Sequence, residues 1–220
     1  MLKSLLFSSL VLPLIVMAAE KKVVSPDLKI LTEATAKYRE AKMVQMHLEK
    51  SVKSDLTGKE TKNEGMISLS AGSFRLESKQ PEKTLLVFDG TTLWNEQQPS
   101  SDFGGSVQVT KTTITGKNKA QTLFATLLTK DPVTKYFKVL TSKVDGNQTI
   151  YETEALNSDL QIKHLTLKID NKTKLVSEIS YQDDIGNVTT MKFSNAQFKS
   201  SIDKKVFQYT PPKGAQVTTI

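Results

Sequence analysis

The chain has 220 residues, a formal net charge of +7 and no cysteine. The lack of cysteine excludes disulfides, thiolate metal sites, a cysteine nucleophile and a lipid-modified N-terminal cysteine. Only Arg39 and Arg75 are arginines, and the lysines are spread along the chain. We therefore expect no nucleic-acid partner, because phosphate and base recognition favour the forked donors of arginine.

Residues 1–19 have the features of a cleaved secretory signal. Lys3 supplies a positive start, residues 5–16 are apolar, and small residues follow, which predicts cleavage after Ala18 or Ala19. The apolar stretch is shorter than the ~20 residues of a membrane-spanning helix, and Pro13 interrupts it. We expect export, with residues 20–220 as a single domain.

The first element after this signal is predicted to be an amphipathic helix. Ser25, Pro26 and Asp27 are typical of a helix start, with a hydroxyl N-cap, an early proline and an acid near the positive end of the helix dipole. Apolar residues then recur at helical spacing, so the helix should lie against an apolar surface. They are Leu28, Leu31, Ala34, Tyr38 and Ala41.

From Val44 onward the apolar period changes from helical to alternating, which indicates half-buried strands. The alternating sets are Val44, Met46 and Leu48; Ile67 and Leu69; Phe74 and Leu76; Val107 and Val109; Phe137 and Val139; Leu160 and Ile162; Leu165, Leu167 and Ile169; and Leu175, Ile179 and Tyr181. So many short strands predict a large antiparallel meander.

Turn residues separate these strands and predict tight hairpins at residues 89–90, 145–147, 170–172 and 185–187. Between Ile162 and Leu165 the alternation slips around His164. That slip predicts a β-bulge and local curvature of the sheet.

A second helix is predicted between the turn-like residues 116–118 and 131–132. Its apolar residues recur at helical spacing. They are Ala120, Leu123, Phe124, Leu127 and Leu128. An apolar helix inserted among strands must cover part of a sheet face, which an ordinary core helix and a lid over a cavity would both do.

No catalytic or metal-binding pattern is present in the sequence. His47 and His164 are far apart and show no HExxH spacing, no serine lies in a GxSxG elbow, and Asp183-Asp184 is typical of a turn. We therefore expect neither an enzyme nor a metal or other cofactor.

Apolar residues are in surplus near the centre of the chain. Residues 85–88 are apolar on both faces of a strand, and Trp94, the single tryptophan, follows the 89–90 turn. An ordinary sheet core and a cavity wall beneath a helical lid both fit this pattern.

Two motifs resemble a known family. Residues 86–94 are similar to the "DGxxLW" hairpin of the outer-membrane lipoprotein carrier protein (LolA) family, with Phe74, Leu76 and Pro81 in the preceding positions. Residues 206–217 resemble the closing strand and the Pro-Pro-x-Gly ending of that family.

The resemblance implies an incomplete antiparallel β-barrel with a helical lid over an apolar cavity. It also implies a monomeric periplasmic carrier of acylated lipoproteins. The carrier would accept cargo from an inner-membrane ABC-type release complex and deliver it to the outer membrane, with an outer-membrane lipoprotein receptor as an optional partner. The candidate acyl-chain-binding residues are Val44, Met46, Leu48, Ile67, Leu69, Phe74, Leu76, Leu86, Phe88, Trp94, Leu123, Phe124 and Leu127.

The sequence departs from the family pattern at two places. Ser70 stands where well-studied members carry an arginine that latches the lid, and Arg75 should face away from Phe74 because adjacent residues of a strand point to opposite faces. Asn95-Glu96 follow the tryptophan in place of an aromatic residue and a proline.

Two other classes of protein remain as alternatives. The same fold resembles the lipid-sensing domain of periplasmic anti-sigma-factor regulators, which carry a second domain, whereas this sequence stops soon after the Pro-Pro ending. A hydrolase would require a constellation of catalytic residues that the sequence spacing does not reveal.

Overall fold

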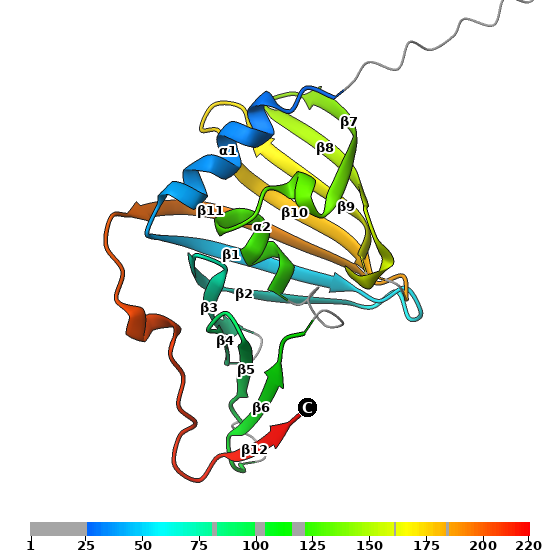
Figure 1. Ribbon diagram of the computed structural model, residues 1–220. Helices are drawn as coiled ribbons and strands as arrows, with labels where there is room; N and C mark the ends of the chain where they lie inside the picture. Colours follow the sequence, from blue (N-terminus) through cyan, green and yellow to red (C-terminus); the bar gives the residue numbers. More distant parts are fainter. Residues whose placement is uncertain (1–25, 81–82, 100–103, 116–121, 161, 184) are drawn as a thin grey trace, which may run out of the picture.

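The computed structural model describes residues 26–80, 83–99, 104–115, 122–160, 162–183 and 185–220, and the predicted signal, residues 1–19, lies outside them. The described residues form one curved, twelve-stranded sheet with helices α1 and α2 on one side of it (Figure 1). The fold is therefore mainly β, as predicted.

The sheet consists of two antiparallel meanders joined edge to edge. The strands are β1 (Met43–Lys53), β2 (Glu60–Ser70), β3 (Ser73–Gln80), β4 (Thr84–Phe88), β5 (Thr92–Gln97), β6 (Gln108–Thr113), β7 (Phe137–Asp145), β8 (Gln148–Ala155), β9 (Ile162–Asp170), β10 (Leu175–Asp183), β11 (Val188–Lys199) and β12 (Gln216–Thr219). Their order is β12-β6-β5-β4-β3-β2-β1-β11-β10-β9-β8-β7. The β1–β11 pair joins the meanders, and only the β12–β6 pair among the described strands is parallel.

The helices are short. They are α1 (Lys29–Glu40), α2 (Leu123–Thr129) and the 3-10 turns η2 (Val133–Lys135), η3 (Ser158–Leu160) and η4 (Lys204–Phe207). Both predicted α-helices are present, although Ser25, the predicted N-cap of the first, and Ala120, predicted on the second, lie outside the described residues. The predicted first position of α1 is wrong, because Pro26 precedes the helix. The Asp27 carboxylate accepts a hydrogen bond from the Lys29 N–H at 2.9 Å, while its own N–H donates to Ser142 on β7 at 3.1 Å. These bonds tie the segment to the sheet before the helix begins.

The predicted turns and bulge are confirmed. Gly90, Gly146 and Gly186 lie at hairpin connections with positive φ. In the β9–β10 pair, Gln182 lies opposite His164 and the next residue of β10 lies opposite Ile162, so β9 contains one extra residue. This is the bulge that the slip in the alternation indicated.

Gly65 permits a close approach of two strands at another irregularity. A Cβ at this position would lie 2.1 Å from the backbone oxygen of Glu77, which no larger residue could satisfy without moving β3. The β2–β3 register shifts at the same point, between Glu64 and Gly65. Glycine therefore allows the sheet to bend here.

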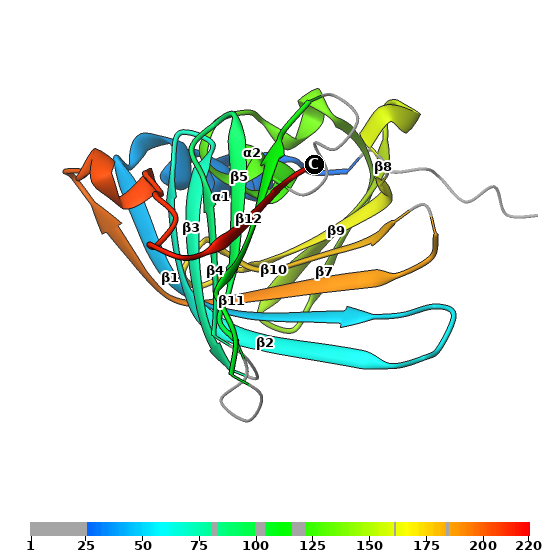
Figure 2. The same cartoon turned by 90° about the horizontal axis from the view of Figure 1, so that it is seen from below.

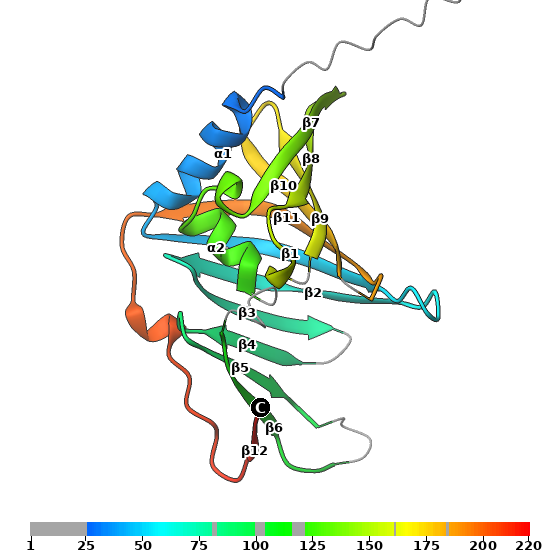
Figure 3. The same cartoon turned by 45° about the vertical axis from the view of Figure 1, so that its right-hand side comes forward.

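The curvature gives the sheet two different faces. Figure 2 shows α1 and α2 on the inner side, which we call the concave face. The buried apolar side chains of both meanders and both helices form one core there. On the outer, convex face, the C-terminal segment runs past β3, β4 and β5 to β12 (Figure 3). Within the described residues, no helix has the length and apolar character needed to cross a bilayer.

Candidate functional site

Apolar side chains form two rows across the concave face of β1 to β5. The first row is Val44, Leu69, Phe74, Phe88 and Leu93. The second row is Met46, Ile67, Leu76 and Leu86. Directly opposite residues of an antiparallel pair have Cβ atoms about 5 Å apart, so each row is a continuous apolar surface. All of these side chains are buried except Leu86, which is half-buried.

Phe74 connects this surface to helix α2. Its ring centroid lies 5.9 Å from that of Phe88 on the neighbouring strand and 5.0 Å from that of Phe124 on α2. Both are distances at which tilted aromatic rings attract one another. The aromatic cluster thus packs the helix onto the centre of the first row.

Helix α2 is apolar on more than one side. Residues 123–129 include no charged side chain, and Ala125, Leu127 and Leu128 are each 0% exposed. A helix that buries residues around its circumference lies inside the structure, and α2 contacts α1, β2 and β3. In this conformation α2 itself occupies the space above the apolar rows.

A buried hydroxyl attaches the C-terminal end of α2 to the sheet. The Thr129 hydroxyl accepts a hydrogen bond from the Gly72 N–H at 2.7 Å and donates to the Ala125 carbonyl at 2.7 Å. We call this contact the Thr129 anchor. Nearby, the Ser70 hydroxyl donates to the Lys42 carbonyl at 2.6 Å, which links β2 to the start of β1. Ser70 therefore bonds to the sheet region and not to a helix.

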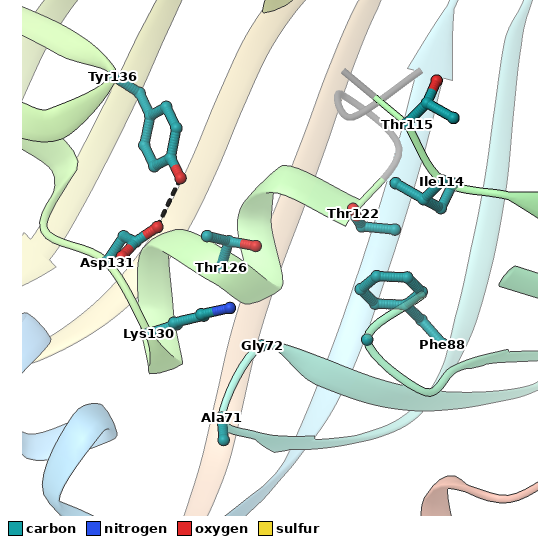
Figure 4. Close-up of a pocket in the computed structure, with 11 residues that line it drawn as sticks. Ala71, Gly72, Phe88, Ile114, Thr115, Thr122, Thr126, Lys130, Asp131 and Tyr136 are labelled. Atoms are coloured by element: carbon teal, nitrogen blue, oxygen red, sulfur yellow. Dashed lines mark hydrogen bonds between the residues drawn. The ribbon is translucent and has the colours of Figure 1, made fainter. Parts of the chain in front are cut away.

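A cavity of about 320 Å³ opens beside α2 (Figure 4). The turns between strands contribute Ala71, Gly72 and Gly90 to its lining, and Phe88, a member of the first row, also lines it. The remaining lining comes from the helix and the segments on either side of it: Ile114, Thr115, Thr122, Thr126, Lys130, Asp131 and Tyr136. The cavity is thus an opening at the edge of the space that α2 fills.

A cluster of charged and polar side chains lies in the segment that directly follows α2. Asp131 accepts a hydrogen bond from the Tyr136 hydroxyl and pairs with Lys135 at 3.0 Å. Burial acts to raise the pKa of Asp131, but the bonds from Tyr136 and Lys135 outweigh it and hold that pKa below its ordinary value. Asp131 is therefore ionised at neutral pH, and its bonds to Lys135 and Tyr136 hold residues 131–136 in one local conformation.

The structure brings together all the candidate acyl-chain-binding residues except Trp94. Val44, Met46, Leu48, Ile67, Leu69, Phe74, Leu76, Phe88, Leu123 and Leu127 belong to the concave core, and Leu86 and Phe124 pack against it half-buried. The shared placement follows from the alternation of the strands and from the packing of α2 on them.

Trp94 lies on the convex face, so its predicted place in the cavity wall is wrong. It pairs with Val87 and Lys111, whereas its neighbour Leu93 pairs with Phe88 on the concave face. Its ring centroid lies 5.3 Å from that of Tyr209, and the Lys111 amine lies 5.2 Å from the indole. Trp94 faces outward because the C-terminal segment covers it, and the spacing of residues near Trp94 does not indicate that contact.

Several concave residues from the second meander were missing from the candidate set. They are Tyr151, Leu167, Ile179, Met191 and Phe193, all buried in the same core. The alternation of Leu167 and Ile179 with polar neighbours was the available signal. From α1, the Tyr38 hydroxyl donates to the Val176 carbonyl at 3.4 Å, and burial raises the pKa of Tyr38 far above its ordinary value.

The convex face also holds Arg75, as predicted. Arg75 pairs across the strands with Val87 and forms an ion pair with Glu77 at 2.6 Å. His47 lies opposite Met66, and His164 lies at the β9 bulge. Among the residues that the structure describes, no three histidine or acidic side chains are grouped so that they could hold a metal ion.

Together these features define a curved, open β-sheet protein whose apolar concave face is covered by helices. The sequence model of the family described as "Outer membrane lipoprotein carrier protein LolA" matches residues 33–210. The chain belongs to that family.

Individual relatives are distant. An outer-membrane lipoprotein carrier protein of Legionella pneumophila (strain Lens) is 24% identical over 149 residues, which are 66% of this chain and 68% of the relative. Its counterpart in Nitrosomonas europaea is 25% identical over 148 residues, 66% of this chain and 67% of the relative. A crystal structure of a LolA superfamily protein from Nitrosomonas europaea aligns with 84% of this chain over 99% of its own length, with 10% sequence identity and a TM-score of 0.46.

Proposed function

We propose that this protein is a periplasmic carrier that binds the acyl chains of lipoproteins on its concave face and transports them from the inner to the outer membrane. Membership of the lipoprotein carrier family supports this proposal. Each CH₂ group removed from water contributes ~0.8 kcal/mol, so an acyl chain needs an apolar host to cross an aqueous compartment. The two apolar rows offer such a surface.

The observation that carries the proposal is the character of α2. It has no charged side chain and is buried against the apolar rows. An acyl chain that replaced α2 on the rows would substitute one apolar cover for another, so the sheet would not be exposed to water during the exchange. Cargo binding therefore requires α2 to move toward the cavity edge shown in Figure 4.

We further propose that the carrier acts as a monomer and without catalysis. It would receive lipoproteins from an inner-membrane ABC-type release complex, and an outer-membrane lipoprotein receptor would accept them where one is present. Without catalysis, transfer depends on differences in affinity between successive binding sites.

The test compares two leucines that are neighbours on β4. Leu86 packs against the concave core, whereas Leu85 faces the convex side with Glu77 and Glu96 opposite it, and both are half-buried. We expect Leu86→Glu to abolish binding of a diacylated lipopeptide, because a carboxylate among acyl chains costs several kcal/mol. Leu85→Glu should bind normally. Equal binding by both folded variants would contradict the proposal.

Export is tested separately. N-terminal sequencing of the protein from a periplasmic fraction should begin at Ala19 or Glu20. Mass spectrometry of material that copurifies with it should detect lipoproteins. Recovery in the membrane fraction with Met1 retained would contradict the periplasmic assignment.

A further inference from the structure

Lys50 is a charged residue on the apolar face of β1. Alternate residues of a strand share a face, so Lys50 follows Val44, Met46 and Leu48 on the concave side. It lies opposite Met191, which is 2% exposed and part of the concave core, and opposite Asn63 on the other neighbouring strand. The lysine is itself half-buried. The methylene groups of Lys50 therefore extend the apolar surface along β1, and its ammonium group is the first charge at the end of that surface.

The acidic residues at this level of the sheet face the other way. Glu49 lies opposite Lys192 and Glu64, one residue out of phase with Lys50. Glu178 also lies opposite Lys192 and pairs with Lys168 at 3.0 Å. The carboxylates thus form a charge ladder with lysines on the convex face. Because the strands separate the two faces, this ladder does not neutralise Lys50.

Within the described part of the chain, Lys50 forms no ion pair or side-chain hydrogen bond. Burial alone lowers its pKa below the ordinary value for lysine. A desolvated ammonium group without a counter-anion is unfavourable, and an anion that enters the same space relieves that cost. The position is therefore incomplete without an anionic partner.

The spacing between this charge and the apolar rows matches a lipid. From Met46, in the second row, to Lys50 the strand extends roughly 13 Å at about 3.3 Å per residue. One leaflet of a bilayer has a hydrocarbon depth of about 15 Å, half of the ~30 Å core. An acyl chain laid along β1 would therefore reach from the second row to the ammonium group.

We propose that Lys50 forms an anion subsite that binds the phosphate of a glycerophospholipid whose acyl chains lie on the apolar rows. This inference rests on the proposed function, since it assumes that acyl chains enter the concave face, and it adds phospholipids to the cargo. Lysine binds phosphate as a point charge and requires no forked geometry. A neutral lipid with the same chains would leave Lys50 without a partner.

The experiment measures displacement of a fluorescent fatty-acid probe from the full mature chain by dipalmitoylphosphatidylglycerol and by dipalmitoylglycerol, which share acyl chains and differ in the phosphate-bearing headgroup. The variants are Lys50→Met, Lys50→Arg and the control Lys53→Met, which removes an exposed lysine from the opposite face of the same strand. Methionine keeps the unbranched stem and removes the charge. Circular dichroism and urea unfolding confirm that each variant is folded.

We expect the native chain to bind the phospholipid roughly ten- to hundred-fold more tightly than the neutral lipid, the range typical of a hydrogen bond to a charged group. Lys50→Met should lose this preference and still bind dipalmitoylglycerol, whereas Lys50→Arg and Lys53→Met should retain it. Equal affinity of the native chain for both lipids would overturn the inference, as would an unchanged preference in Lys50→Met.

Two further results separate the possible sources of failure. If inorganic phosphate alone at millimolar concentration perturbs the Lys50 amine resonance as strongly as the phospholipid does, the site binds free phosphate, and the lipid assignment is wrong. If the fatty-acid probe, both lipids and a diacylated lipopeptide all fail to bind, the proposed function fails. If the lipopeptide and dipalmitoylglycerol bind and the phospholipid binds no more tightly than dipalmitoylglycerol, only the Lys50 inference fails.

Discussion

Next to the turn that joins them, β4 and β5 carry apolar side chains on both faces of the sheet, and a different cover lies over each face. On the concave face, Phe88 and Leu93 belong to the core beneath the helices. On the convex face, Val87 is 0% exposed although it points away from the helices, and Trp94 packs against Tyr209 of the C-terminal segment. A strand that is apolar on both faces therefore indicates two covers and does not by itself identify a binding cavity.

The two covers are attached in different ways. The C-terminal segment is held by backbone bonds to β6 and to the residue before it. The Gln216 N–H donates to the Val107 carbonyl at 2.9 Å, and the Ile220 N–H donates to the Lys111 carbonyl at 3.0 Å. The Tyr209 hydroxyl adds a bond to Glu96 at 2.6 Å. Helix α2 has apolar packing and the Thr129 anchor. Removal of α2 breaks few directional bonds, so we expect it to be the cover that moves.

A tether on α2 tests this difference with the largest expected effect. A Cβ on Gly72 would lie 3.7 Å from the Cβ of Lys130, within the range of a disulfide. We expect the oxidised double variant Gly72→Cys, Lys130→Cys to lose lipopeptide uptake because α2 cannot leave the rows. Reduction should restore uptake, and fluorescence of a labelled lipopeptide measures both states.

The reduced protein is the control for strain in this variant. Gly72 has φ +88°, so a cysteine there costs roughly 1–2 kcal/mol in both redox states. A difference between the two states therefore reports the tether alone. Equal uptake by oxidised and reduced protein would show that α2 is ordinary core and not a lid.

Truncating one aromatic residue on each face compares how firmly the covers pack. Phe74 is 2% exposed and contacts rings on β4 and α2. Phe74→Ala should lower the free energy of unfolding by about 3–5 kcal/mol through lost burial and a residual cavity. Trp94 is half-buried, so Trp94→Ala should cost less. Urea unfolding measures both, and a larger loss for Trp94→Ala would reverse our view of which face holds the core.

Much of the fold could be predicted because strand alternation is a local signal. The slip around His164 gave the bulge, and the residues at 89–90, 145–147 and 185–187 gave three hairpins. Each depends on neighbours in the sequence. The capping of α1 failed because a contact with Ser142, far along the chain, fixes the segment before the helix.

The site was predictable only in part for the same reason. Alternation placed Phe74 and Leu76 together, but the faces of two different strands are related only through their register. The distance along the chain from the turn at residues 89–90 does not determine which residue of β5 lies opposite Phe88. That residue is Leu93, so Trp94 faces the other side of the sheet. The parallel pairing of β12 with β6 brings the C-terminal segment over the convex face, and no local pattern indicates that contact.

Thr129→Val removes the Thr129 anchor while it nearly preserves side-chain volume. The Gly72 N–H would then be a buried donor without a partner, which costs about 1–3 kcal/mol. We expect lower stability and faster lipopeptide uptake. The control is Thr35→Val on α1, because Thr35 is also buried and donates to the carbonyl four residues earlier. Unfolding and stopped-flow uptake measure the effects, and equal acceleration in both variants would contradict a specific role for the anchor.

The smallest expected effect at neutral pH is that of Tyr209→Phe on the convex cover. The ring can still stack on Trp94, and only the hydroxyl bond to Glu96 is lost, which we expect to cost about 0.5–1.5 kcal/mol. Lipopeptide uptake should not change, because Tyr209 lies on the face opposite α2. Slower or faster uptake in this variant would show that the two covers are coupled.

The same substitution has a predictable pH dependence. Burial, and then the Glu96 carboxylate, raise the pKa of Tyr209 above its ordinary value, whereas in the unfolded chain a tyrosine titrates near pH 10. Below about pH 10 both states hold the proton and the contribution to stability is complete; as pH rises further, the unfolded chain releases the proton before the folded one, and stability falls. Tyr209→Phe lacks this term and retains the other tyrosines, so urea unfolding from pH 7 to 11 should show a shallower alkaline decline in the variant. Parallel declines would show that the Tyr209 hydroxyl is solvated and that its bond to Glu96 does not contribute to stability.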